Sequence, residues 1–140
     1  MRVNLMRYAG VYIAAAVGLA VLIWIADAAF GLRLPTGLST ALPPMLAALL
    51  EGQAFARAYR ELAPNGEAWS IALRMTLVVA VINAVILLGM LLFTPQLADP
   101  EAFGIIAVVF VVLLGLVLVV NRVFFGMGVK SQLKALEGGK

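Results

Sequence analysis

Glu51 is the residue of this chain most suited to a chemical role, because it is a carboxylate inside a long apolar stretch. On a helix it stands about 9 Å along the axis from Arg57 and about 12 Å from Pro43. A charged carboxylate at the centre of a lipid-exposed helix costs about 2.5–3.5 kcal/mol, so we expect Glu51 to face other helices and to be paired or protonated. Arg74, at comparable depth in the next apolar stretch, is the predicted partner.

The predicted Glu51–Arg74 pair has two chemical interpretations. It is either an interhelical ion pair that fixes the register of two helices, or a proton or cation site within the membrane. A contact with a partner protein is a third interpretation of the same charges. Asn83 and Asn121 are the other polar residues in or near the apolar layer, and hydrogen bonds between helices from such amides contribute about 0.6–2 kcal/mol.

The composition removes most catalytic chemistry. The chain has no cysteine and no histidine, and therefore no thiol nucleophile, no zinc–thiolate site and none of the usual imidazole ligands or bases. No clustered set of Asp, Glu or Ser near an interface takes their place. Its basic residues are scattered rather than gathered in a stripe, which argues against nucleic acid. We expect a protein that is not an enzyme and that holds no metal and no cofactor.

The residues above must be positioned by helices that cross a membrane. With 64% hydrophobic and 12% charged residues, the chain is far from the composition of soluble proteins. Four apolar runs, at about 8–30, 38–57, 69–93 and 103–125, approach the ~20 residues that a membrane-spanning helix needs. Residues 1–140 are therefore predicted to form a single all-α domain, a polytopic antiparallel up-down bundle of four transmembrane helices. Both a closed bundle and an open row satisfy the short loops.

The basic residues predict the orientation. Of the ten lysines and arginines only Arg33 falls on one side of the predicted membrane, and the rest fall on the other. By the positive-inside rule both termini and the loop between the second and third runs are cytoplasmic. Residues 126–140, after a hinge at Gly126–Gly128, are predicted to be a cytoplasmic tail.

Two prolines leave the second helix open to two interpretations. Pro43 and Pro44 either occupy the first turn of the helix, where their missing amide hydrogens cost little, or they follow a non-helical segment over residues 36–42 that dips into the membrane.

Small residues recur four apart in three of the runs. Because lipid is as apolar as leucine, membrane helices associate through close backbone approach, which small residues permit. We expect these positions either to pack within one chain or to contact a partner or a second copy, whereas the valine-rich fourth run keeps more free surface. The predicted packing positions are Gly10, Ala14 and Gly18; Ala48, Gly52 and Ala56; and Ala72, Thr76, Ala80 and Ala84.

Two short stretches carry a resemblance to a known family. Glu51-Gly52-Gln53-x-Phe55-Ala56-Arg57 and Pro64-x-x-Glu67-x-Trp69 resemble the corresponding parts of a family of small bacterial inner-membrane proteins with four predicted helices and no assigned function. The resemblance implies the topology and an inner (cytoplasmic) membrane location. It brings no catalytic residues.

Two functional classes follow as expectations. The first is a non-enzymatic accessory or assembly subunit that packs against a larger membrane complex, with the lipid bilayer and a membrane protein or a second copy as partners. The second is a small oligomeric transporter or channel for protons, cations or small solutes, with Glu51 as its site, Arg74 as the counter-charge and Asn83 in the pathway.

Overall fold

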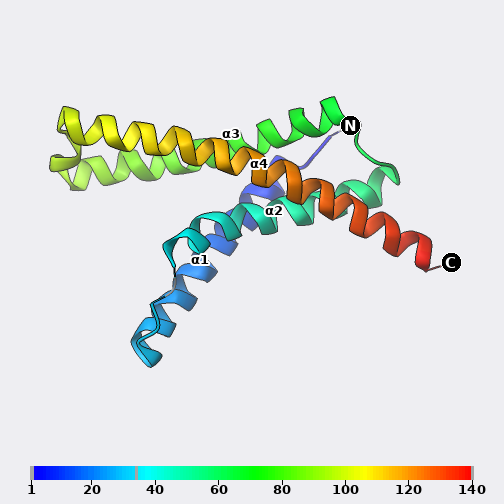
Figure 1. Cartoon of the computed structure of the whole chain (residues 1–140), viewed down its shortest axis with the longest axis horizontal. Coiled ribbons are helices and arrows are strands. Elements are labelled where there is room, and N and C mark those ends of the chain that lie inside the picture. The colour runs from blue at the N-terminus through cyan, green and yellow to red at the C-terminus, as the bar shows by residue number, and fades with distance from the viewer. Residues whose placement is uncertain (1, 34, 140) are drawn as a thin grey trace.

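Four helices and one short 3₁₀ turn make up the part of the chain that the structure describes. The computed structural model describes residues 2–33 and 35–139, apart from the side chains of Thr36 and Leu38. The all-α prediction is confirmed (Figure 1). The elements are α1 (Leu5–Phe30), α2 (Thr36–Tyr59), α3 (Asn65–Phe93), η1 (Pro95–Ala98) and α4 (Pro100–Gly138).

Three of the helices have the length and composition of membrane spans. Within the described residues these are α1, α3 and α4. The prediction of four such helices is confirmed for these three, whereas α2 is shorter than the others and carries Glu51, Gln53 and two prolines. These residues lower the hydropathy of α2 below that of a helix that would enter lipid alone.

The first helix has clear end signals. The side chain of Asn4 accepts a hydrogen bond from the backbone N–H of Arg7, which satisfies one of the free amides of the first turn. At the other end Gly31 adopts a left-handed conformation, with φ 63°, and its N–H donates to carbonyls of the last turn.

Both interpretations of Pro43-Pro44 are wrong. α2 begins at Thr36, so residues 36–42 are helical and the prolines lie in the helix interior. The proline φ is compatible with a helix, and what each proline removes is one amide donor to the preceding turn. Pro43 and Pro44 are both buried, which places this part of α2 against its neighbours rather than against lipid.

The fourth helix runs through the predicted hinge. α4 continues for 39 residues to Gly138, and Gly128 is buried within it. Gly128 permits close packing of α4 against a neighbouring helix and does not bend α4. Residues 126–138 are therefore the last part of α4 and not a separate tail.

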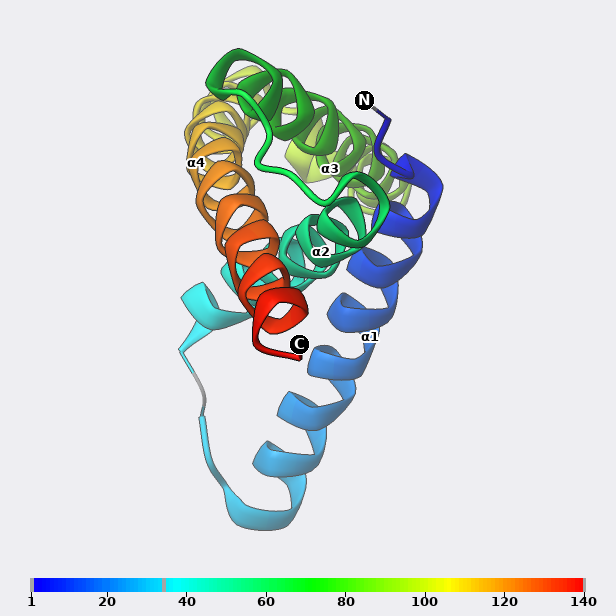
Figure 2. The same cartoon turned by 90° about the vertical axis from the view of Figure 1, so that its right-hand side faces the viewer.

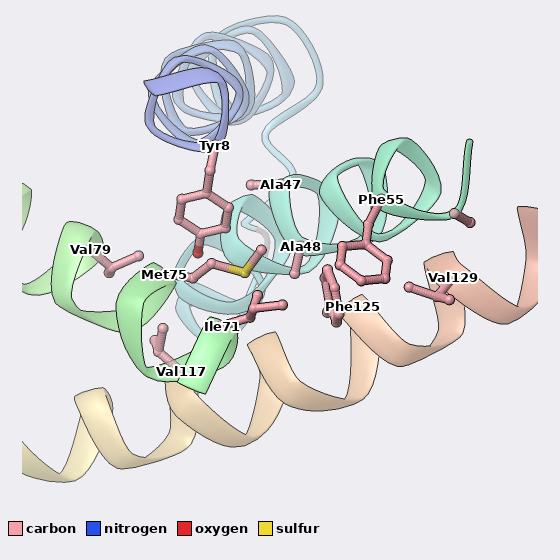
Figure 3. Close-up of a cluster of buried hydrophobic side chains, with 11 residues drawn as sticks. Tyr8, Ala47, Ala48, Phe55, Ile71, Met75, Val79, Val117, Phe125 and Val129 are labelled. Atoms are coloured by element: carbon pink, nitrogen blue, oxygen red, sulfur yellow. The ribbon is translucent and has the colours of Figure 1, made fainter. Parts of the chain in front are cut away.

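The helices are arranged openly around a small core. α3 and the first half of α4 lie side by side, with η1 joining them, while α2 crosses the second half of α4 (Figure 1). The outer half of α1 diverges from the other helices (Figure 2). The core lies where all four helices meet, and it includes Tyr8, Ile71, Met75 and Phe125 (Figure 3).

Candidate functional site

Glu51 lies in the core and is bonded to Arg7. Its carboxylate Oε1 accepts a hydrogen bond from Nε of Arg7, and the two groups form an ion pair between α2 and α1. Glu51 is 1% exposed, so the expectation that it faces the other helices and is paired is confirmed. The side chain of Arg7 is 48% exposed and reaches the carboxylate from the edge of the protein.

The predicted partner of Glu51 is wrong. Arg74 is exposed on α3 and lines an apolar groove between α3 and α4 together with Leu73 and Leu77. Depth counted from the sequence favours Arg74, because Arg7 precedes the first apolar run, yet Arg7 is the residue that reaches Glu51. Arg7 reaches the carboxylate on α2, whereas Arg74 lies exposed at the groove between α3 and α4.

A hydrogen-bond network beside this ion pair connects three helices. The hydroxyl of Tyr8 on α1 donates to Oδ1 of Asn121 on α4 at 2.8 Å, and Nδ2 of Asn121 donates to the hydroxyl of Thr76 on α3 at 3.1 Å. Thr76 in turn donates to the carbonyl of Ala72 at 2.9 Å. Asn121 and Tyr8 are both fully buried. Asn121 is thus an interhelical hydrogen-bonding residue, as the sequence predicted, whereas Tyr8, which the sequence suggests as an aromatic residue at the membrane surface, lies in the core.

Asn83 makes a similar link farther along α3. Its Nδ2 donates to the hydroxyl of Tyr12 on α1 at 3.0 Å and to the carbonyl of Val79 at 2.8 Å. Asn83 and Tyr12 line a cavity of about 330 Å³ that all four helices border, with Ser39 and Thr40 of α2 on its wall. Asn83 therefore orients α1 against α3 and contributes a polar group to the cavity.

Removing the Tyr8 hydroxyl should weaken this network measurably. In Tyr8→Phe the packing of the ring remains while Oδ1 of Asn121 loses its donor in the core. We expect a loss of about 1 kcal/mol in the free energy of unfolding, measured by denaturation in detergent micelles. Tyr12→Phe is the matched control and should cost less, since Tyr12 is only partly buried. Equal effects of the two substitutions would contradict the role assigned to Asn121.

The predicted packing positions divide by helix. Ala48, Gly52 and Ala56 on α2 are buried, and so are Ala72 and Thr76 on α3. Ala80 is partly buried and Ala84 is exposed, because α3 leaves the core in that direction. For Gly10, Ala14 and Gly18 on α1 the expectation of packing within one chain is wrong, since all three are exposed.

α2 and α4 approach each other closely at two glycines. A Cβ atom at Gly52 would lie 2.2 Å from the carbonyl oxygen of Phe125, and one at Gly128 would lie 2.2 Å from that of Leu49. The two backbones are therefore in direct contact, which only glycine permits. The rings of Phe55 and Phe125 meet edge to face beside this crossing, with centroids 5.4 Å apart.

These polar groups form hydrogen bonds and an ion pair between helices, and their geometry indicates no further chemistry. No group of three or more Asp, Glu, His or Cys side chains within residues 2–33 and 35–139 is arranged to hold a metal ion. Comparison of the chain with protein-family models, with curated proteins and with solved structures finds no match.

Proposed function

We propose that this protein is a small non-enzymatic integral membrane protein that acts as an accessory or assembly subunit of a larger complex in the bacterial inner membrane. The role proposed for the α1–α2–α3–α4 core is structural, and the role proposed for α1 is docking. The proposal rests on the exposed surface of α1 and on the bonds that the polar groups of the core form with one another.

The exposure of α1 is the main observation in support of the proposal. This 26-residue apolar helix buries one residue, Tyr8, and its outer half stands apart from the other helices (Figure 2). Its exposed stripe of Gly10, Ala14 and Gly18 has the spacing that lets a second helix approach closely, and a Cβ at either glycine would meet nothing within 4 Å. Lipid covers such a surface without needing the small residues, whereas a partner helix makes use of them.

The orientation proposed for the complex has four crossings with both termini in the cytoplasm. α2 is long enough, at 24 residues or about 36 Å, to cross with the other helices. Arg7 neutralises Glu51, and the buried prolines face protein, so the features that lower the hydropathy of α2 are covered by its neighbours. The charge bias of the loops supports the same orientation.

Transport through Glu51 is the competing function. It would require Arg7 to leave the carboxylate in each cycle, since Glu51 has an arginine donor already in place. The accessory role needs no such step.

The test is to fill the α1 stripe with larger side chains. In the double variant Gly10→Leu, Gly18→Leu we expect loss of a companion that travels with the wild-type protein at fixed ratio through gentle-detergent purification, measured by native mass spectrometry. Gly104→Leu on α4 is the matched control, since Gly104 is also free of contacts within 4 Å and should retain the companion.

Two results would count against the proposal. A wild-type protein that purifies as a 14.8 kDa monomer without a companion would contradict the accessory role. A companion that survives the double variant would show that α1 is not the docking face. A complex whose mass is a multiple of the monomer mass would identify the partner as a second copy.

A further inference from the structure

A pocket with two cationic residues lies where α3 begins beside the second half of α4. It has a volume of about 490 Å³, and its walls include Asn65 and Ala68 of α3 and Arg122, Gly126 and Lys130 of α4. The three α4 residues are four apart and thus lie along one side of the helix. Gly126, between the two cations, leaves the space that a larger side chain would fill.

Among residues 2–33 and 35–139, no acid forms an ion pair with Arg122. Its Nη2 donates to the neutral Oδ1 of Asn65 at 3.1 Å, its guanidinium lies 5.6 Å from the ring centre of Trp69, and its Nε is buried without an acceptor. Neither Arg122 nor Lys130 has an acidic partner within the described part of the chain. The acid of the first turn of α3, Glu67, is not on the pocket wall.

The start of α3 adds to the positive potential. α3 begins at Asn65 without a side-chain cap, and Asn65 and Ala68 of its first turn line the pocket. Free amides and the helix dipole at such an end favour an anion, and phosphate is the group most often found there. The pocket therefore combines a guanidinium, an ammonium and a helix N-terminus.

An apolar groove between α3 and α4, which Arg74 also lines, lies about one helical turn from this pocket. Its lining includes Leu73, Leu77, Leu114, Gly115 and Leu118, and its volume is about 470 Å³. Leu73 lies one turn from Trp69, and Leu118 lies one turn from Arg122, so the groove starts about 6 Å from the cation. Trp69 is half exposed at the junction, which is the position of an aromatic residue at a membrane surface.

We propose that this surface binds one anionic phospholipid, with its phosphate between Arg122 and Lys130 and one acyl chain in the groove between α3 and α4. A headgroup with its own ammonium would bring a third cation next to Arg122 and Lys130, whereas an anionic headgroup adds negative charge alone and therefore fits better. Basic pockets between membrane helices are the usual sites of such lipids. The proposal requires residence in a membrane and does not depend on the accessory role.

The fluorescence of Trp69 offers a direct test. Trp24 and Trp69 are the two tryptophans of the chain, and Trp24 is 70% exposed on α1, so Trp24→Phe leaves Trp69 as the reporter without disturbing packing. This protein is placed in dioleoylphosphatidylcholine vesicles that contain the same small fraction of acyl-brominated phosphatidylglycerol or acyl-brominated phosphatidylcholine. We expect the brominated phosphatidylglycerol to quench Trp69 more strongly, with about fivefold preferential binding for each cation engaged.

Matched variants distinguish a site from general surface charge. Arg122→Gln and Lys130→Gln should each lower the preference about fivefold, whereas Lys134→Gln, which removes the same charge one turn beyond the pocket, should leave it unchanged. Lys130 is exposed, so its substitution reports on binding even if Arg122→Gln weakens the fold. Gly115→Leu should lower the preference by filling the groove, and Gly104→Leu should not.

Three outcomes would overturn the proposal. Equal quenching by the two brominated lipids would show that no anionic lipid is selected. An equal loss in Lys130→Gln and Lys134→Gln would show that diffuse charge, not the pocket, attracts the lipid. Complete removal of the preference by millimolar inorganic phosphate would show that the site takes a free phosphate and that the groove contributes nothing.

Discussion

Alanine in place of Gly52 or Gly128 is expected to destabilise the protein more than any other single methyl group added to it. In both cases the new Cβ would lie 2.2 Å from a backbone carbonyl oxygen of the facing helix, which cannot swing aside as a side chain would. α2 and α4 would have to separate, and overpacking of this kind costs about 1–3 kcal/mol. We expect each substitution to fall near the upper end of that range.

The measurement is denaturation in detergent micelles, followed by circular dichroism. Gly104→Ala and Gly115→Ala are the controls on the same helix as Gly128, because a Cβ at either position meets nothing within 4 Å. Their free energies of unfolding should equal that of the wild type or exceed it by up to about 1 kcal/mol, because alanine favours the helix more than glycine does. If Gly52→Ala and Gly128→Ala behaved like these controls, that result would contradict direct contact between the backbones of α2 and α4.

Breaking the Arg7–Glu51 pair is expected to have unequal effects from its two sides. Arg7→Gln leaves a carboxylate that is 1% exposed without its cationic partner, and this should cost about 3 kcal/mol or more. Glu51→Gln leaves Arg7, whose side chain is 48% exposed and can turn to the membrane surface, so the loss should be about 1 kcal/mol. The same denaturation assay ranks the variants.

Two further variants complete this experiment. The double variant Arg7→Gln, Glu51→Gln should be more stable than Arg7→Gln alone, because no charge remains buried. Arg74→Gln should lie within about 0.5 kcal/mol of the wild type, since Arg74 is exposed and does not contact Glu51. A large effect of Arg74→Gln together with a small one of Arg7→Gln would restore the pairing that the sequence predicted.

The existence and limits of the helices follow from the sequence to a large degree. Long apolar runs separated by turn residues predict four helices near their observed positions, and Gly31 ends α1 as such a residue should. Pro43 and Pro44 misled the prediction of α2, because their effect depends on what surrounds them. Here they lie buried inside a helix that continues on both sides, and local sequence does not contain that information.

The partner of Glu51 needed information that hydropathy lacks. Depth along a helix can be counted from residue numbers, and it correctly indicates a buried and paired carboxylate. The angle at which helices cross, and hence which arginine faces which acid, depends on the packing of all four helices. Tyr8, between Arg7 and the rest of α1, reads in the sequence as an interfacial aromatic, yet its hydroxyl lies in the core.

Small residues are ambiguous for a related reason. The same four-residue spacing occurs in α1, where it is exposed, and in α2, where it is buried against α4. The spacing indicates that a backbone could approach, and only the structure shows where one does. Gly128, which in sequence suggests a hinge, has the closest approach of all, together with Gly52.

The unbroken length of α4 has a mechanical consequence. A helix of 39 residues is about 58 Å long, roughly twice the ~30 Å of the hydrocarbon layer. Its last turns are therefore a rigid extension of the part of α4 that packs on α2. A change of 10° in the tilt of α4 would displace an end that projects about 25 Å by about 4 Å. Bilayer thickness, through tilt, would thus set how far Gly138 stands from the membrane surface.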